Sequence, residues 1–251
     1  LSSWRDGFHV KTNTGPIVVE DCDMAWLRDD CINISAIALT LQKQVGDRAY
    51  RFCVPNREAF PAIKPGYTLE GWNMNSGRHC GAATVETVLP GTETGYWNVI
   101  LQLTEPLKNV AGEPEITRFW VHEYSNAESV IRNNRFDGSV RFRAPGLYEN
   151  NLVTHFMIVK PDINECPLTH DMVFRGNRLP MTGIRTIFGV FRGESPVEPP
   201  PRNAENPPDR LVRNIRIENN ELGRPIYLFD AADSTVRNNR LLPSLPDGKA
   251  L

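Results

Sequence analysis

The sequence contains no long apolar run, no excess of basic residues and no closely spaced pair of cysteines. Its hydrophobic stretches are short and interrupted, so a membrane-spanning helix is not expected. The formal net charge is −2 and no basic stripe is present, which argues against a nucleic-acid partner. The five cysteines lack the C-x-x-C spacing of zinc sites, so we expect no metal and no cofactor. Two of them, Cys22 and Cys31, lie in apolar runs and are expected to be buried thiols.

Short runs of β-branched and aromatic residues, separated by turn formers, predict an all-β chain. A strand is expected at residues 17–19, and another directly after Asp29 and Asp30. The pattern changes between residues 39 and 122, where turns separate runs that partly alternate, as half-buried antiparallel strands do. We predict that residues 39–122 form an inserted small antiparallel β-barrel or sandwich, and that residues 1–38 and 123–251 together form the larger domain.

A loose phrase, Val-x-Arg-Asn-Asn-x-Leu/Phe, recurs after residue 123. Its five copies lie at residues 130–136, 147–152, 172–179, 215–222 and 236–241. Irregular repeats of about 20 residues, each a strand followed by Asn-Asn, predict a β-solenoid. Asn tolerates the left-handed backbone of a sharp corner, and its amides stack into hydrogen-bonded ladders between neighbouring coils.

Three carboxylates are expected to meet on one surface of this solenoid. Asp6 precedes Asp30 by 24 residues, about one coil, and Asp29 adjoins Asp30. Strands in neighbouring coils lie ~4.8 Å apart, and like charges that close raise the pKa of one group. A protonated acid beside an ionised base is suited to glycoside hydrolysis, but ordinary turn formation also explains these aspartates. Because successive strand residues face opposite sides, the chain must bend if Asp29 and Asp30 both act.

The order of these motifs resembles a known family. Asp6-Gly7-Phe8-His9, then Val19-Glu20-Asp21-Cys22, then Asp29-Asp30-Cys31-Ile32-Asn33-Ile34 is similar to the α-1,3-galactosidases of glycoside hydrolase family 110. These belong to the pectin-lyase-like enzymes and carry a small β-barrel after the double Asp. The resemblance implies a right-handed parallel β-helix and an inverting, exo-acting α-galactosidase mechanism. Ser35 stands where the family has His. A weaker similarity links residues 29–32 to polygalacturonases, whose Gly-His-Gly and Arg-Ile-Lys segments are absent here.

These patterns assign catalytic roles to Asp6, Asp29 and Asp30. We expect the base within Asp29–Asp30, a water-polarising role for Asp6, and an acid from the insert, either Glu58 or Glu70. The candidate substrate-binding residues are His9, Arg5, Arg28, Asn33, Trp26 and Glu70. Trp26 either stacks on a sugar or packs inside a coil, and Arg5 and Arg28 either pair with the carboxylates or bind an acidic sugar. The remaining histidines, His79, His122, His155 and His170, are scattered and suggest no metal site.

Two other functions stay open at this point. One is a polysaccharide lyase or C5-epimerase, which needs a base near a uronate and a cation to neutralise it. The other is a non-catalytic, glycan-binding β-helix. In each case the expected partner is a carbohydrate, and exposed β-helix ends are compatible with a homo-oligomer. Because a patterned segment begins at the first residues, we expect the chain to start inside a longer product that is secreted or periplasmic.

Overall fold

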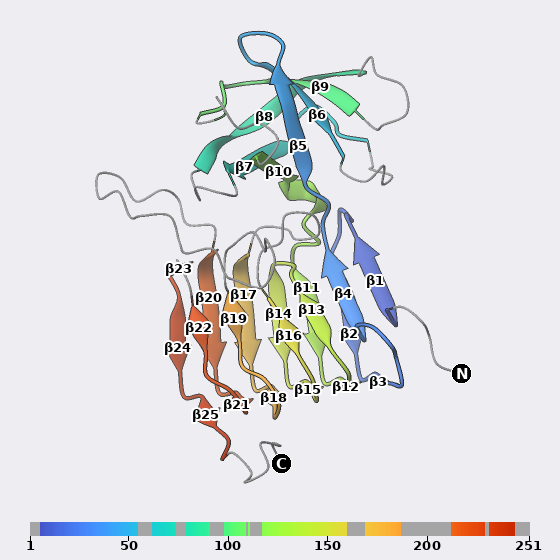
Figure 1. The fold of residues 1–251 in the computed structure, drawn as a ribbon, viewed down its shortest axis with the longest axis vertical. Helices are drawn as coiled ribbons and strands as arrows, with labels where there is room; N and C mark the ends of the chain where they lie inside the picture. The colour runs from blue at the N-terminus through green and yellow to red at the C-terminus, as the bar shows by residue number, and fades with distance from the viewer. Residues whose placement is uncertain are drawn as a thin grey trace.

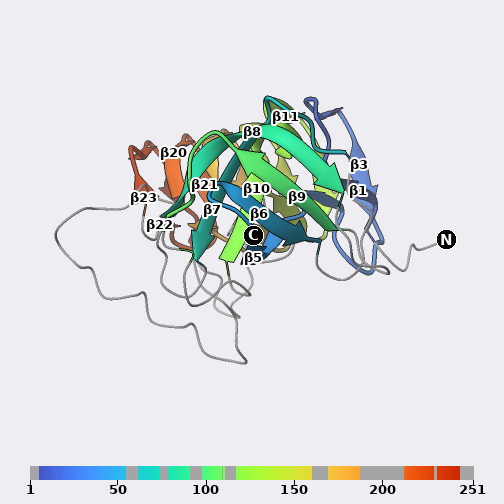
Figure 2. The ribbon, with the colours of Figure 1, turned by 90° about the horizontal axis from the view of Figure 1, so that it is seen from above.

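The computed structural model describes residues 6–54, 62–73, 79–90, 98–108, 110, 117–159, 169–186, 212–228 and 231–243. A closed antiparallel barrel stands over a set of parallel sheets (Figure 1), and the view from above shows it lying across them (Figure 2). The prediction of an all-β chain with a small barrel is confirmed. No helix in the described ranges is long and apolar enough to cross a membrane.

The barrel contains six strands. In spatial order they are β10 (Thr117–Val121), β5 (Leu39–Gln44), β6 (Ala49–Cys53), β9 (Asn98–Leu103), β8 (His79–Pro90) and β7 (Thr68–Asn73). Alternating side chains such as Leu39, Leu41 and Phe119 fill its interior, as the partial alternation predicts. A short 3-10 helix, η3 (His122–Tyr124), leads from β10 back to the parallel sheets.

Three parallel sheets hold the strands before and after the barrel. The first contains β1 (Phe8–Lys11), β4 (Ile32–Ser35), β13 (Val140–Phe142) and β16 (Met157–Ile158). The second contains β2 (Val18–Glu20), β11 (Ser129–Arg132), β14 (Gly146–Glu149), β17 (His170–Arg175), β20 (Val212–Glu218) and β23 (Ala231–Ala232), with β24 (Thr235–Arg237) also paired to β20. The third contains β3 (Asp23–Ala25), β12 (Arg135–Asp137), β15 (Leu152–Val153), β18 (Arg178–Leu179), β21 (Glu221–Leu222) and β25 (Arg240–Leu241). A separate pair joins β19 (Arg185–Thr186) to β22 (Tyr227–Leu228).

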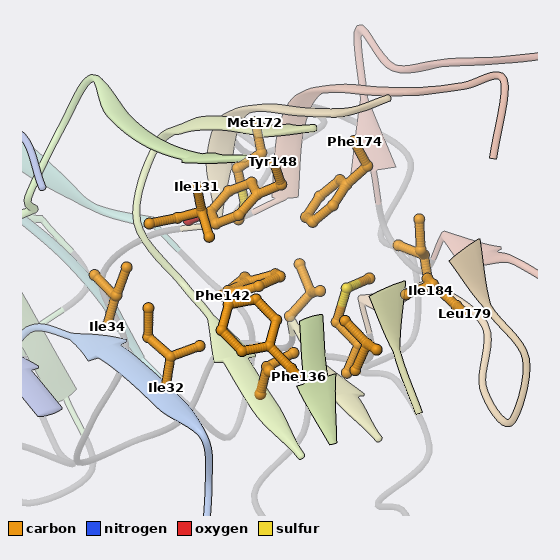
Figure 3. Packing of buried hydrophobic residues seen from close by; sticks show 14 of the residues in the cluster. Ile32, Ile34, Ile131, Phe136, Phe142, Tyr148, Met172, Phe174, Leu179 and Ile184 are labelled. Carbon is orange, nitrogen blue, oxygen red and sulfur yellow. The ribbon is translucent and has the colours of Figure 1, made fainter. Parts of the chain in front are cut away.

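The chain visits these sheets in a fixed order. It passes from the second sheet to the third and then to the first, as in β2, β3, β4 and again in β11, β12, β13. Each such passage is called a circuit below. Strands of successive circuits pair in parallel, so equivalent residues lie side by side. The apolar residues of all three sheets point inward into one core (Figure 3), where the rings of Phe142, Tyr148 and Phe174 stack with centroids 4.6 and 5.0 Å apart.

The Asn-Asn repeat forms the corner between the second and third sheets. The first Asn of each pair takes the left-handed backbone conformation, as at Asn133 (φ 56°) and Asn150 (φ 53°), and Gly176 replaces it once (φ 65°). The second Asn is buried in the first four copies, where it donates through Nδ2 to Oδ1 of the next copy, and half-buried in the last. Its four links join Asn134, Asn151, Asn177, Asn220 and Asn239 at 2.9, 3.0, 3.0 and 2.8 Å. The predicted asparagine ladder is confirmed.

The cysteines are free thiols in the described part of the chain. Cys31 is fully buried, and burial raises the pKa of its thiol to about 11, which keeps it protonated. Cys22 is only half-buried, so the expectation of a buried thiol is confirmed for Cys31 but not for Cys22.

Removing one amide from the middle of the ladder tests its contribution. Asn177→Ala leaves the backbone and side-chain N–H groups of Asn151 without their acceptor inside the core. We expect a loss of ~2–4 kcal/mol in the free energy of unfolding by urea. The exposed corner variant Asn133→Gly, which accepts the same backbone conformation, is the control and changes stability by less than ~0.5 kcal/mol.

Candidate active site

Asp6, Asp29 and Asp30 lie together at the start of two neighbouring strands. Asp6 precedes β1 and Asp30 precedes β4, and the parallel pairing of these strands sets Phe8 beside Ile32. The backbone N–H of Gly7 donates to the carbonyl of Asp30 at 2.9 Å, which extends the pairing toward the aspartates. Carboxylate oxygens of the three residues all lie within 4.8 Å of one another. The structure therefore brings together the trio that the repeat spacing predicts to be neighbours.

The two adjacent aspartates have different surroundings. The chain bends at Arg28 and Asp29, and this bend lets both side chains approach the same point. Asp29 is exposed and accepts a hydrogen bond from the backbone N–H of Asp30 at 3.1 Å, whereas Asp30 is only 3% exposed. Burial raises the pKa of Asp30. Arg141 opposes this rise, but the charges of Asp6 and Asp29 add to it, and the net pKa stays above the ordinary value.

Three polar side chains lie in a row beside the trio. His9, Asn33 and Arg141 are register partners across β1, β4 and β13. His9 Nδ1 lies 2.8 Å from Asp6 Oδ2, and the Arg141 guanidinium contacts the Asp30 carboxylate. The predicted binding candidates His9 and Asn33 are therefore at the trio. The sequence motifs do not identify Arg141, although its place between Val140 and Phe142 follows strand alternation one circuit beyond Asn33.

Asn33 is the most enclosed member of this row. It is 2% exposed, and its Oδ1 atom finds no hydrogen-bond donor among the described residues. An unsatisfied buried acceptor is energetically costly, and because this atom is enclosed, it is out of reach of a bound molecule in this structure.

The other predicted binding residues are placed less uniformly. Trp26 is 83% exposed and has a left-handed backbone (φ 62°), so the interpretation that it packs inside a coil is wrong. Its ring is accessible three residues before Asp29. Arg28 is also exposed, and the ion pair with Asp30 is made by Arg141. Arg5 and Glu58 lie outside the described residues.

Glu70 is not a suitable proton donor for the trio. It belongs to barrel strand β7, where His122 Nε2 lies 2.6 Å from Oε2, His79 Nε2 lies 3.2 Å from Oε1, and Arg213 donates to Oε2 at 3.2 Å. Burial alone would raise the pKa of Glu70, but the two histidines and Arg213 hold it well below its usual range. The prediction that Glu70 supplies the acid is therefore wrong, and its assignment as a substrate-binding residue stays a prediction.

Glu70 instead joins the barrel to the second parallel sheet, because Arg213 belongs to β20. On β17, His170 lies with its ring 6.1 Å from that of His122 and pairs with Asp171 at 2.6 Å. Arg213 also lies over the ring of Trp72, 5.8 Å from its centroid. The interpretation of His79, His122 and His170 as scattered is thus wrong, since all three converge on this junction.

The trio is also the strongest candidate for a cation-binding site. Within the described ranges it is the sole group of at least three His, Cys, Asp or Glu residues whose ligand atoms lie this close. However, the Arg141 guanidinium already contacts Asp30, and a positive charge there competes with a metal ion. The arrangement therefore fits proton transfer between carboxyl groups better than metal binding.

Comparison with known proteins adds little to this picture. No family model matches the chain, and no curated protein matches it. Among solved structures, the chain is similar to the tailspike protein gp49 from Pseudomonas phage LKA1, with 10% sequence identity and a TM-score of 0.25. The similarity covers 92% of this chain and 46% of the tailspike chain, so this chain spans less than half the length of that protein.

The junction role of Glu70 predicts a pH-dependent loss of stability. Because the pKa of Glu70 is lower in the folded state, its contribution is present above the unfolded pKa of ~4.3 and is lost as the pH falls below it. Glu70→Gln should lower the free energy of unfolding by ~2–4 kcal/mol at pH 7, and the difference from wild type should shrink below pH ~4. Urea unfolding at pH 7 and below pH ~4 measures this difference in the free energy of unfolding. The exposed Glu105→Gln serves as control, and equal stability of Glu70→Gln and wild type at pH 7 would contradict the assignment.

Proposed function

We propose that this chain is a glycoside hydrolase that cleaves a terminal sugar from a glycan by carboxylate acid/base catalysis. The observation that supports the proposal is the trio itself, which holds one buried carboxyl of raised pKa against an exposed carboxylate. Glycosidases use two carboxyl groups whose environments differ, so that one of them donates a proton and the other acts as base or nucleophile. The choice of an α-galactoside-like substrate rests on the resemblance to glycoside hydrolase family 110.

The proposal includes the finer fold. The three parallel sheets are the sides of a right-handed parallel β-helix, and the barrel is an insertion between two of its coils. The circuit order of the strands and the asparagine ladder support this architecture. In it, the trio occupies the corner that leads into the first sheet, at the end of β4 remote from the barrel strand β5.

The roles follow from burial and charge. We assign proton donation to the leaving oxygen to Asp30, because its pKa is raised above the ordinary value of an aspartate. Asp29, exposed at the bend, is the second carboxyl group of the pair. Asp6 is held by His9 and contributes negative charge beside the reacting carbon. Trp26 offers an apolar ring face to a sugar.

The spacing of the trio revises the expected stereochemistry. Inverting enzymes separate their two carboxyl groups by ~6.5–9.5 Å to admit water, and retaining enzymes by ~5–5.5 Å. One carboxylate oxygen from each member of the trio lies within 4.8 Å of the others, a spacing closer to the second value. If the trio supplies both groups, Asp29 attacks the anomeric carbon and the configuration is retained.

A polysaccharide lyase or epimerase is the second candidate. The observation that favours it is the cation beside the trio, where the Arg141 guanidinium contacts the Asp30 carboxylate. Arginine neutralises the carboxylate of a uronate, which such reactions require. The non-catalytic glycan-binding alternative has no separate observation in its favour.

A panel of terminal α- and β-glycosides, with product anomers followed by proton NMR, tests the proposal. Wild type should release sugar from at least one α-galactoside with retained configuration. Asp30→Asn should lower kcat/KM by ~10²–10⁴-fold because it removes the proton donor. The exposed barrel-turn variant Asp47→Asn should match wild type. Absence of turnover across the panel would contradict the proposal, and a product with an ultraviolet-absorbing double bond would assign the lyase instead.

A further inference from the structure

Acidic and basic side chains alternate strictly along the second parallel sheet. At the last position of successive strands, the order from β2 to β24 is Glu20, Arg132, Glu149, Arg175, Glu218 and Arg237. Each arginine contacts the glutamate one circuit earlier, with distances of 2.6 Å for Arg132–Glu20, 2.6 Å for Arg175–Glu149 and 2.5 Å for Arg237–Glu218. Arg132 and Arg175 also have a glutamate as register partner on their other side. Within the described residues Arg237 has one such neighbour, Glu218, because β24 is the last strand of this sheet there.

The two edges of the third sheet carry the same charges as the two edges of the second sheet. Arg135 lies 3.9 Å from Asp23 at its first edge, and Arg240 contacts Glu221 at its last edge. The first edge of the paired sheets therefore ends in the acidic residues Glu20, Asp21 and Asp23. The last edge ends in the arginines Arg237 and Arg240. The two edges therefore carry opposite charge. If the last edge were placed against the first edge, the alternation of acidic and basic residues would continue.

The last edge also leaves core positions open. Ile217 and Leu222 are buried in their circuit, but their register partners Val236 and Leu241 are 48% and 60% exposed. The hollow above them has a volume of about 330 Å³, and its lining includes Ile226, Val236, Leu241, Arg224, Arg237 and Arg240. Asn239 is the last asparagine of the ladder in the described residues. An open strand edge with uncovered apolar side chains is a site for pairing with another strand.

We propose that the last edge of one copy stacks on the first edge of a second copy of this chain, head to tail. In this arrangement Arg237 and Arg240 meet Glu20 and Asp23 of the second copy, and the charge alternation continues across the contact. Among the described strands, β2 pairs with β11 alone. Stacking two last edges would instead place arginines against arginines. The contact is heterologous, so it extends into longer assemblies as concentration rises.

A charge-reversal pair tests this contact by sedimentation equilibrium. Wild type should show a mass that rises with concentration, and the rise should weaken with added salt. Arg237→Glu/Arg240→Glu and, separately, Glu20→Arg/Asp23→Arg should each raise the dissociation constant at least tenfold. An equimolar mixture of the two variants should associate like wild type, because every acidic edge again meets a basic one. This rescue separates loss of the contact from loss of folding.

A control variant, Lys43→Glu/Lys64→Glu, changes net charge as much as Arg237→Glu/Arg240→Glu does, at exposed positions in and beside the barrel strands. It should associate like wild type. A wild-type chain that stays monomeric at all concentrations, as it would if its own tail covered the last edge, would overturn the proposal. So would a mixture of the reversed variants that fails to associate.

Discussion

The buried asparagine ladder is the interaction on which the rest of the structure depends. Each internal amide is satisfied on both sides, as Asn151 shows by donating to Asn177 and accepting from Asn134. A slip by one residue would leave these groups unpaired inside the core, so the ladder sets the register of the second and third sheets. It reaches the first circuit through the N–H of Cys22, which donates to Asn134. Parallel register in turn is what places Asp6 beside Asp30.

Two buried carboxyl groups show how the same chemistry serves different purposes. Glu70 is surrounded by His122, His79 and Arg213, so the pKa is lowered and the charge joins the barrel to β20. Asp30 has one arginine against two neighbouring carboxylates and its own burial, so the pKa is raised. A satisfied ion cluster stabilises a junction, whereas a carboxyl held away from its ordinary pKa is a candidate for proton transfer.

The predictable features are those with a local or periodic signal. The repeated Asn-Asn marks corners where only a few residues tolerate the left-handed backbone, and the 24-residue offset of Asp6 from Asp30 is close to the length of one such repeat. Arg141 and the Glu70 cluster were not predictable in this way. The contact between Glu70 and Arg213 joins residues 143 positions apart and leaves no spacing to recognise. The sequence left Trp26 open between stacking on a sugar and packing inside a coil, because an aromatic residue in a strand-like run ordinarily packs inward; here the backbone turns left-handed and the ring is exposed.

The raised pKa of Asp30 is the claim from which the proposed chemistry follows, and carbon-detected NMR titration of the carboxyl groups tests it most directly. The account predicts that Asp30 titrates above the ordinary value of ~3.9, and that Asp6→Asn lowers its apparent pKa because one of the neighbouring negative charges is removed. An Asp30 carboxyl that titrates at the ordinary value in both proteins would contradict the account.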